Sequence, residues 1–406
     1  MENRETIITL MEKGVKIFNP DSVLIGNEVD TDRISGENVL IYPGTRIFGE
    51  KTLIMPGARL GFESPVTIDN VFVGSDVNLK GGFFEKAVFA GKNAFGSGAH
   101  VREGTILEEE SCAAHTVGLK QTILFPFVTL GSLINFCDCL MAGGTSRKDH
   151  SEVGSSFIHF NYTPNQDKAT PSIFGNIFQG VMLKSRPVFL GGQGGVAGPC
   201  RLAFGSVTAA GTLCRRDELR QNRLIFGGAL KQGSILRSEG IYTNPGKIFE
   251  KNCLYIAGLI ALKSWYKNIR SLFIDDFFSE ELLKGMNLTL QQGIDERIKR
   301  LEAFCGKLER SRHLLLSKSD GKKAGLITIH NEIINKWDAV KQHFILESEI
   351  DRSESVPEGF SAAVDHGIKE NGKDYIKVIQ SLDSEKAGMG SAWLESIEKS
   401  IMDRIK

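Results

Sequence analysis

The first half of the chain carries apolar residues that recur at every sixth position. Each is often followed by glycine or another small residue and then by turn-forming residues. The step is kept by Ile41 and Ile47, by Ile54, Leu60 and Val66, by Val73 and Leu79, by Phe89, Phe95, Val101 and Leu107, by Val117 and Ile123, by Leu130 and Phe136, and by Leu190, Val196 and Leu202. A period of six is too short for a repeat that contains a helix, so it predicts one short strand and one turn per repeat.

Three such repeats would close one triangular coil of about 18 residues, and the coils would stack into a solenoid. The apolar residue would point inward and pack on its equivalents, with Gly or Asn at the corners that need a positive φ. The alternative is an ordinary β-sandwich, in which an apolar and polar alternation of period two would dominate. Because that alternation does not dominate, we predict a mainly β fold, a parallel β-helix, followed by an α-helical region.

Two segments interrupt the six-residue step and are predicted to be loops inserted at corners of the solenoid. They lie near residues 142–151 and near residues 160–171. Functional residues often lie on such loops. We place an N-terminal helix at residues 1–20, the β-helix at residues 21–246, and an α-helical C-terminal domain at residues 247–406.

The C-terminal part carries a helical pattern. Ser279 precedes two glutamates, which is typical of a helix N-cap with acidic residues in the first turn. The spacing then alternates between four and three residues in the apolar stripe Ile294, Ile298, Leu301, Cys305 and Leu308. Two interpretations stay open, a coiled coil and a helix packed on its own domain.

Composition agrees with this division and limits the partners. Of the 44 glycines, 33 lie in residues 1–246, where solenoid corners would use them. The 49 Lys and Arg balance the 49 Asp and Glu, so no overall field would hold nucleic acid or an anionic membrane. The longest apolar stretch, Leu254–Leu262, is far shorter than the ~20 residues of a membrane span. We expect no nucleic-acid partner and no membrane partner.

The N-terminus and the cysteines indicate the compartment. Residues 1–13 are polar and charged, so no signal peptide is expected. The seven cysteines are an odd number, and Cys137 and Cys139 lack a second pair at the spacing of a zinc site. Free thiols in a reducing cytoplasm are the simplest interpretation, and no metal is expected.

Several motifs of the first half follow one another at a specific spacing. They are Ala99-His-Val-Arg102-Glu-Gly, Val117-Gly-Leu-Lys120, Phe160-Asn161-Tyr162 with Lys168 after it, and the coils from Phe189 to Thr212. In order and spacing they resemble the left-handed β-helix (hexapeptide-repeat) acyltransferases. The resemblance is closest to the acetyltransferase half of the bifunctional N-acetylglucosamine-1-phosphate uridyltransferase / glucosamine-1-phosphate acetyltransferase.

The resemblance implies a sugar phosphate or nucleotide sugar of the UDP-N-acetylglucosamine pathway as the small-molecule partner. Arg102 and Lys120 would hold the phosphate, because Arg offers a planar fork of donors and Lys a point charge. Tyr162 and Lys168 would also contact the substrate. Arg147 and Lys148 could complete a basic pocket, although charged residues of this kind are often only solvated surface groups.

The resemblance also implies a donor and an assembly. Acetyl-CoA or another acyl-CoA would lie along the last coils, near Ala209 and Ala210. Proteins of this class are usually homotrimers with acyl-CoA sites between neighbouring subunits. His100 and His115 lie near the phosphate motifs, where they are either structural or in contact with ligand.

The sequence departs from the family where N-acetyl transfer needs a base to take the proton of the attacking amine. The family's histidine is replaced by Ser132, and its tyrosine three positions later by Asn135; both are expected to contact the substrate. Ser132 is a poor base alone, because its hydroxyl is far from ionising near neutral pH. Besides the family's Asn161, the catalytic candidates are His159, which would share a strand face with Asn161, and His150 on the inserted loop. Each histidine could instead be purely structural.

Three functions therefore stay open. The first is an acyltransferase-like enzyme that acts on a sugar phosphate or nucleotide sugar. The second is a catalytically impaired β-helix that binds a sugar phosphate or regulates, which Ser132 favours. The third is nucleotidyl transfer, which the absence of a preceding nucleotide-binding domain argues against.

Overall fold

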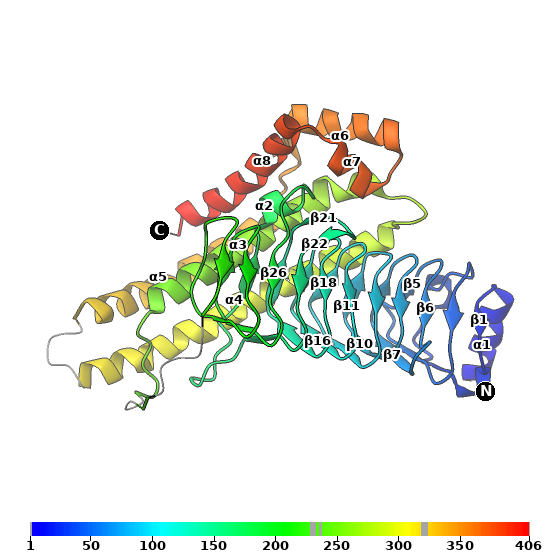
Figure 1. Cartoon of the computed structure of the whole chain (residues 1–406), viewed down its shortest axis with the longest axis horizontal. Coiled ribbons are helices and arrows are strands. Elements are labelled where there is room, and N and C mark those ends of the chain that lie inside the picture. Colours follow the sequence, from blue (N-terminus) through cyan, green and yellow to red (C-terminus); the bar gives the residue numbers. More distant parts are fainter. Residues whose placement is uncertain (1, 228–232, 235–237, 318–323, 406) are drawn as a thin grey trace.

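The chain forms a three-sided parallel β-solenoid with long helices packed along its middle and C-terminal coils (Figure 1). The computed structural model describes residues 2–227, 233–234, 238–317 and 324–405. Helix α1 (Glu2–Glu12) lies at the N-terminal end of the solenoid (Figure 1). The predicted fold class, a mainly β parallel β-helix followed by an α-helical region, is confirmed.

Three parallel sheets form the sides of the solenoid, and we name them A, B and C. Sheet A contains β1 (Lys16–Ile17), β3 (Leu40–Ile41), β6 (Arg59–Leu60), β9 (Asn78–Leu79), β12 (Ala94–Phe95), β15 (Cys112–Ala113), β18 (Thr129–Leu130), β23 (Glu152–Val153), β26 (Phe189–Leu190), β29 (Val207–Thr208) and β31 (Leu224–Ile225). Sheet B contains β2 (Leu24–Ile25), β4 (Arg46–Phe48), β7 (Val66–Asp69), β10 (Gly82–Glu85), β13 (Ala99–Val101), β16 (Val117–Lys120), β19 (Ile134–Cys137), β24 (Ile158–Phe160), β27 (Gly195–Ala197) and β30 (Leu213–Cys214). Sheet C contains β5 (Leu53–Ile54), β8 (Phe72–Val73), β11 (Ala87–Phe89), β14 (Thr105–Leu107), β17 (Ile123–Leu124), β20 (Cys139–Met141), β25 (Ser172–Phe174) and β28 (Arg201–Leu202).

The six-residue step gives the solenoid its core. The apolar residues at this step are buried, for example Ile41, Ile47 and Leu60. Phe89 and Phe95 pack edge to face with ring centroids 5.3 Å apart, one on sheet C and the next on sheet A. These inward residues stack on their equivalents in neighbouring coils, so the core is continuous from coil to coil.

The corners depend on positive φ angles, as the glycine content predicts. Gly57 has a φ of +75°, and a Cβ there would lie 2.1 Å from Asp76 Oδ1 of the next coil. Some corners use other residues with positive φ, among them Asn70 and Gln121. Tight corners explain why glycine is concentrated in this half of the chain.

The two inserted segments leave different corners. Residues 142–151 contain a β-hairpin of β21 (Gly144–Ser146) and β22 (Asp149–His150), between a strand of sheet C and one of sheet A. Residues 160–171 lie mostly between β24 of sheet B and β25 of sheet C. The inserts therefore lie at opposite edges of sheet C, one at its corner with sheet A and the other at its corner with sheet B.

Helices follow the last described strand of the solenoid. They are α3 (Pro245–Asn268), α4 (Glu280–Ser317), α5 (Ala324–Glu349), α6 (Glu358–Asn371), α7 (Tyr375–Ser381) and α8 (Ser384–Asp403), with the short α2 (Ile177–Gly180) earlier in the chain. The 3₁₀ turns are η1 (Pro20–Ser22), η2 (Thr31–Arg33), η3 (Arg270–Phe273) and η4 (Ser353–Ser355). Ser279 accepts a hydrogen bond from Leu282 N (3.2 Å), which confirms the predicted N-cap of α4.

Helix α4 packs within its own chain. Its predicted apolar stripe is buried, including Ile294 and Leu301, and it contacts α3, α5 and strands of sheet C. A Cβ on Gly285 would lie 2.5 Å from the Phe72 ring of sheet C, so the helix approaches the strands closely. The interpretation of a helix packed on its own domain is therefore confirmed by the contacts with α3 and α5, and the helix packs on the solenoid as well.

Buried polar pairs join the helices to the solenoid corners. The Arg270 guanidinium contacts the Glu109 carboxylate, and Tyr266 donates a hydrogen bond to Glu108 (2.6 Å). Burial is the main cause that raises the pKa of Glu108 to about 7.

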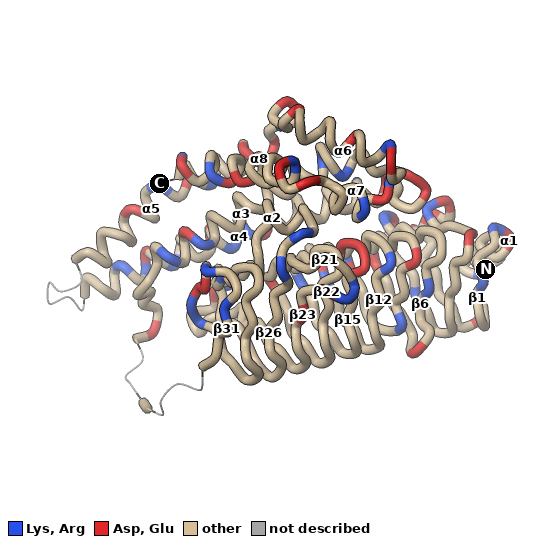
Figure 2. Tube along the Cα trace, turned by 45° about the horizontal axis from the view of Figure 1, so that its top comes forward, with Lys and Arg blue, Asp and Glu red and all other residues tan. Residues whose placement is uncertain are grey.

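Lys and Arg are interspersed with Asp and Glu along the helices (Figure 2). In the described part of the chain, no helix is long and apolar enough to cross a membrane.

Candidate functional site

Arg102 and Lys120 lie side by side where the strands of sheet B end. Val101 of β13 pairs with Leu119 of β16, so the next residues, Arg102 and Lys120, occupy equivalent places in neighbouring coils. Arg102 N donates to Leu119 O (2.9 Å) across this pair. We call the turns from sheet B to sheet C the BC corner. The two residues expected to hold a phosphate are thus brought together by the register.

The Nε of Arg102 is the polar atom of this corner that lacks a hydrogen-bond partner among the described residues. This atom is also buried. Lys120 Nζ lies 2.5 Å from a carboxylate oxygen of Glu103. Burial is the main cause that raises the pKa of the neighbouring Cys137 thiol to about 11, so this cysteine is a neutral neighbour. A buried guanidinium donor without a partner is unfavourable, and an anionic oxygen would satisfy it.

A shallow groove runs over the outer face of sheet B from this corner. Its volume is about 490 Å³. It is lined by Gly98, His100, Arg102, Thr116, Val117, Gly118, Leu133, Ile134, Asn135 and Ile158. Side chains alternate between the two faces of a strand, so His100, Gly118 and Asn135 face outward together. Arg102 and Asn135 therefore share one open surface.

Ser132 lies at the opposite edge of sheet B, in the turns that come from sheet A, which we call the AB corner. Its Oγ and His115 Nδ1 are 2.9 Å apart. Its backbone N donates to Ser155 Oγ (3.1 Å). The position at which the resemblance places a basic histidine is thus occupied by a serine that pairs with a histidine of the preceding coil.

Asn161 stands at the BC corner and is tied to the helical region. Asn161 Nδ2 donates to Asp138 Oδ2 (2.5 Å), and Asp138 Oδ1 lies 2.6 Å from Arg297 Nη2 of α4. Both members of this ion pair are buried. Sequence reasoning missed Asp138 and Arg297. The available signal was Arg297 next to Ile298 in the apolar stripe of α4, where a charge needs a buried partner.

Tyr162 and Lys168 follow on the inserted loop. Tyr162 is 57% exposed, and Lys168 O accepts a bond from Arg297 Nη1 (3.5 Å). The loop is tied to the helical region by Asp167, which accepts a hydrogen bond from Tyr242 (2.7 Å). The loop therefore starts beside the Arg102 corner, with Tyr162 open to solvent.

The structure places His159 inside the solenoid, away from the groove. Its Nδ1 lies 2.7 Å from Cys137 O and its Nε2 2.8 Å from Ser172 Oγ. Burial is the main cause that lowers its pKa to about 4. Both ring nitrogens are engaged within the core, so His159 has the surroundings of a structural residue.

His150 and its basic neighbours lie on the hairpin beyond sheet C, also away from the groove. His150 Nδ1 is 3.0 Å from Arg147 O. Arg147 donates to Phe127 O (2.8 Å) and to Glu110 O (3.0 Å), carbonyls of neighbouring coils. Sheet C therefore lies between this hairpin, which carries His150, Arg147 and Lys148, and the BC corner that carries Arg102.

Ala209 and Ala210 lie on the AB corner, on the same side as Ser132. The register links Asn135 with Ile158, Gly195 and Leu213 in successive coils. The residues three positions earlier are Ser132, Ser155, Gly192 and Ala210. A row of short side chains therefore leads along the corner from Ser132 to Ala210.

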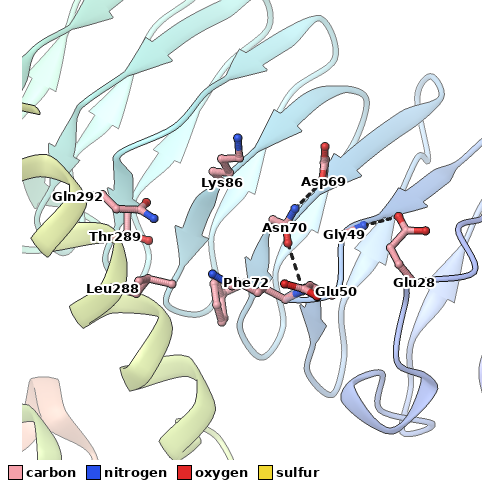
Figure 3. A pocket seen from close by; sticks show the side chains of 11 residues that line it. Glu28, Gly49, Glu50, Asp69, Asn70, Phe72, Lys86, Leu288, Thr289 and Gln292 are labelled. Carbon is pink, nitrogen blue, oxygen red and sulfur yellow. Dashed lines mark hydrogen bonds between the residues drawn. The ribbon is translucent and has the colours of Figure 1, made fainter.

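A second hollow, of about 400 Å³, lies between the early coils and α4 (Figure 3). Its polar groups hold turns together: Gly49 N donates to Glu28 Oε1 (2.8 Å), and Lys51 N donates to Asn70 Oδ1 (3.1 Å). The bond from Gly49 lowers the pKa of Glu28.

In the described residues, no group of three or more His, Cys, Asp and Glu could hold a metal ion. The groove on sheet B is the stronger candidate site.

The stacked coils place the chain among the parallel β-solenoid proteins, and a curated relative agrees with the hexapeptide-repeat resemblance. The Bifunctional protein GlmU of Fervidobacterium nodosum is 27% identical over 208 residues, which are 51% of this chain and 40% of that protein. The chain thus spans about 40% of the length of this relative. No protein-family model matches. The solenoid and this sequence match together confirm the similarity to hexapeptide-repeat, acyltransferase-like proteins.

Proposed function

We propose that the chain is an acyltransferase that binds a sugar phosphate or nucleotide sugar in the groove on sheet B. The observation that carries the proposal is the pairing of Arg102 and Lys120 at one end of the groove, with Arg102 Nε buried and unpartnered. A phosphate there would accept the guanidinium donors and meet the lysine charge. Tyr162 and Lys168 on the adjoining loop would close over the sugar.

The donor in this proposal is acetyl-CoA or another acyl-CoA. The short side chains Ser155, Gly192 and Ala210 leave the AB corner open beside Ser132, so a long thioester chain would fit along them. The acyl group would then arrive at the Ser132 end of the groove, with the sugar phosphate held at the Arg102 end.

We also propose a homotrimer in a reducing cytoplasm. Leu133 and Ile158, which line the groove, and Phe160 beside them are 55%, 41% and 47% exposed. Apolar clusters on a soluble surface often mark an interface, and neighbouring copies would cover this one. All seven cysteines are unpaired, as a reducing compartment would keep them. Light scattering at micromolar concentration should give three subunits, and a clean monomer would contradict a shared site.

A thermal-shift experiment tests the proposed ligands. Glucosamine-1-phosphate, UDP-N-acetylglucosamine and acetyl-CoA should each raise the melting temperature, since binding to the folded state stabilises it. Arg102→Ala should remove the sugar-phosphate shift and keep the acetyl-CoA shift. Arg59→Ala, on the exposed side of sheet A, is the matched control and should keep both. A sugar-phosphate shift that survives Arg102→Ala would place the ligand elsewhere.

A second function, a binding or regulatory β-helix without catalysis, is favoured by one observation. His159 and His150 both lie away from the groove. In that case glucosamine-1-phosphate would shift the melting temperature and acetyl-CoA would not.

A further inference from the structure

His115 and Ser132 form a hydrogen-bonded pair at the end of the groove opposite Arg102. His115 Nδ1 and Ser132 Oγ are 2.9 Å apart. Val117 of β16 pairs with Ile134 of β19, so the residues two positions earlier, His115 and Ser132, are equivalent in neighbouring coils. The pair therefore follows from the stacking of two coils.

The backbone holds both members of this pair in place. Leu133 N donates to His115 O (3.1 Å), and Ser132 N donates to Ser155 Oγ (3.1 Å). The residues that follow the pair, Thr116 and Leu133, have φ angles of 58° and 59° and make the same turn in each coil. These backbone bonds hold Ser132 and His115 in place, so that the Ser132 hydroxyl can hold the His115 imidazole.

The pair borders the groove that holds the proposed phosphate site. Thr116 and Leu133, the residues after His115 and Ser132, line the groove, and so does Arg102. His115 lies five positions before Lys120, so at most about 16 Å of backbone at ~3.3 Å per residue separates them. Because the amine of glucosamine-1-phosphate is on the carbon next to the phosphate-bearing carbon, the long Arg102 and Lys120 side chains would have to hold the whole ligand over sheet B, within reach of the His115 ring.

We propose that His115 is the general base for acyl transfer in this groove and that Ser132 is its positioning residue. The inference rests on the proposed acyltransferase function. The imidazole lost from position 132 is replaced by one from the preceding coil. In this role His115 Nδ1–H would donate to Ser132 Oγ, which would fix the tautomer and leave the Nε2 lone pair free.

The chemical step balances with these groups. The acceptor amine of an amino sugar phosphate attacks the thioester carbonyl of the acyl-CoA, a C–N bond forms, and the C–S bond breaks. The amine proton goes to His115 Nε2, and the thiolate of CoA leaves and takes a proton. Ser132 stays chemically unchanged and keeps the imidazole oriented.

The experiment compares variants by the release of CoA thiol from acetyl-CoA and glucosamine-1-phosphate. His115→Gln should lower kcat about 100-fold or more with binding of both ligands retained, since positioned general bases contribute about 10²–10⁴-fold. Ser132→Ala should lower kcat less and leave KM unchanged, and Ser132→Thr, which keeps a hydroxyl, should recover much of the loss. His366→Gln, on the exposed side of α6, is the matched control and should have no effect.

The double variant His115→Gln with Ser132→His is the most discriminating test, because it places an imidazole at position 132. It should regain activity over His115→Gln alone. Full activity in His115→Gln would overturn the assignment of His115 as the general base and would leave the acyltransferase proposal standing. Wild-type protein that binds both ligands without releasing thiol would overturn the base and favour the binding function. Wild-type protein that binds neither ligand would overturn the proposed function and the base with it.

Discussion

Sheets B and C are built from the same repeat and differ in what covers their outer faces. On sheet C the outward Phe72 is 6% exposed, because α4 packs against it. On sheet B the outward positions of equivalent coils carry His100 and Asn135, which line an open groove, and Phe83, which is half-buried against the His100 ring. The inward residues are alike and both faces carry an outward phenylalanine, so the packing of α4, and not the repeat itself, decides which face is covered and which is free for ligand.

The largest expected effect concerns the ion pair that ties the helices to the BC corner. Arg297→Ala leaves the buried Asp138 carboxylate without its partner and should lower the free energy of unfolding by about 3–5 kcal/mol. Chemical denaturation measures it. The double variant with Asp138→Ala removes both charges and should be more stable than Arg297→Ala alone. Equal stability of the two variants would show that the pair does not support the interface.

A matched pair of phenylalanines compares the two sheets directly. Phe72→Ala on sheet C should lower the free energy of unfolding by about 3 kcal/mol, as truncation of a buried aromatic residue does. Phe83→Ala on sheet B should lower it by about 1 kcal/mol or less, because its face is open. The midpoints of denaturant unfolding of the two variants give the comparison. Similar losses would contradict the assignment of a covered and an open face.

The phosphate end of the groove should carry much of the ligand affinity. Arg102→Ala should weaken the binding of glucosamine-1-phosphate about 10- to 100-fold, because a hydrogen bond to a charged group contributes about 1.5–3 kcal/mol. Isothermal titration calorimetry measures the change. Arg102→Lys keeps the charge without the fork and should bind with intermediate affinity. Unchanged affinity in Arg102→Ala would remove this end from the site.

A pH dependence is expected at the covered side. Glu108 has a folded pKa of about 7, raised from 4.5 mainly by burial. The folded state holds this proton more tightly, so its contribution to stability falls as pH rises from about 4.5 to about 7. Glu108→Gln lacks this loss, and its stability relative to wild type should increase between about pH 5 and about pH 7.5. Melting curves at the two pH values measure it, and parallel behaviour would contradict the assignment.

The fold could be predicted from the sequence because the repeat is local. The six-residue step at Ile41 and Ile47 requires only a short strand and a turn, and glycine-rich corners allow the coils to stack. The Ser279 cap and the stripe with Ile294 were predictable for the same reason. The pairing of Arg102 with Lys120 follows from their spacing, which is close to one coil.

The rest of the site depends on contacts that no local pattern contains. Arg297 meets Asp138 only because α4 folds back over the solenoid. His159 lies on the inward face of its strand and is buried. The alternation of side chains along a strand predicts which residues share a face, but it does not tell which of the two faces points into the solenoid. The His115 and Ser132 pair had a usable signal, since their separation equals that of Val117 and Ile134.

The central claim is that a phosphate-bearing ligand binds on the open face of sheet B, between the two corners. A crystal structure of the protein with glucosamine-1-phosphate tests this directly. The phosphate should lie against Arg102 and Lys120, with its oxygen accepting from the Arg102 guanidinium and the amine directed toward His115. Ligand density at another place, with Arg102 Nε still unpartnered, would contradict the account.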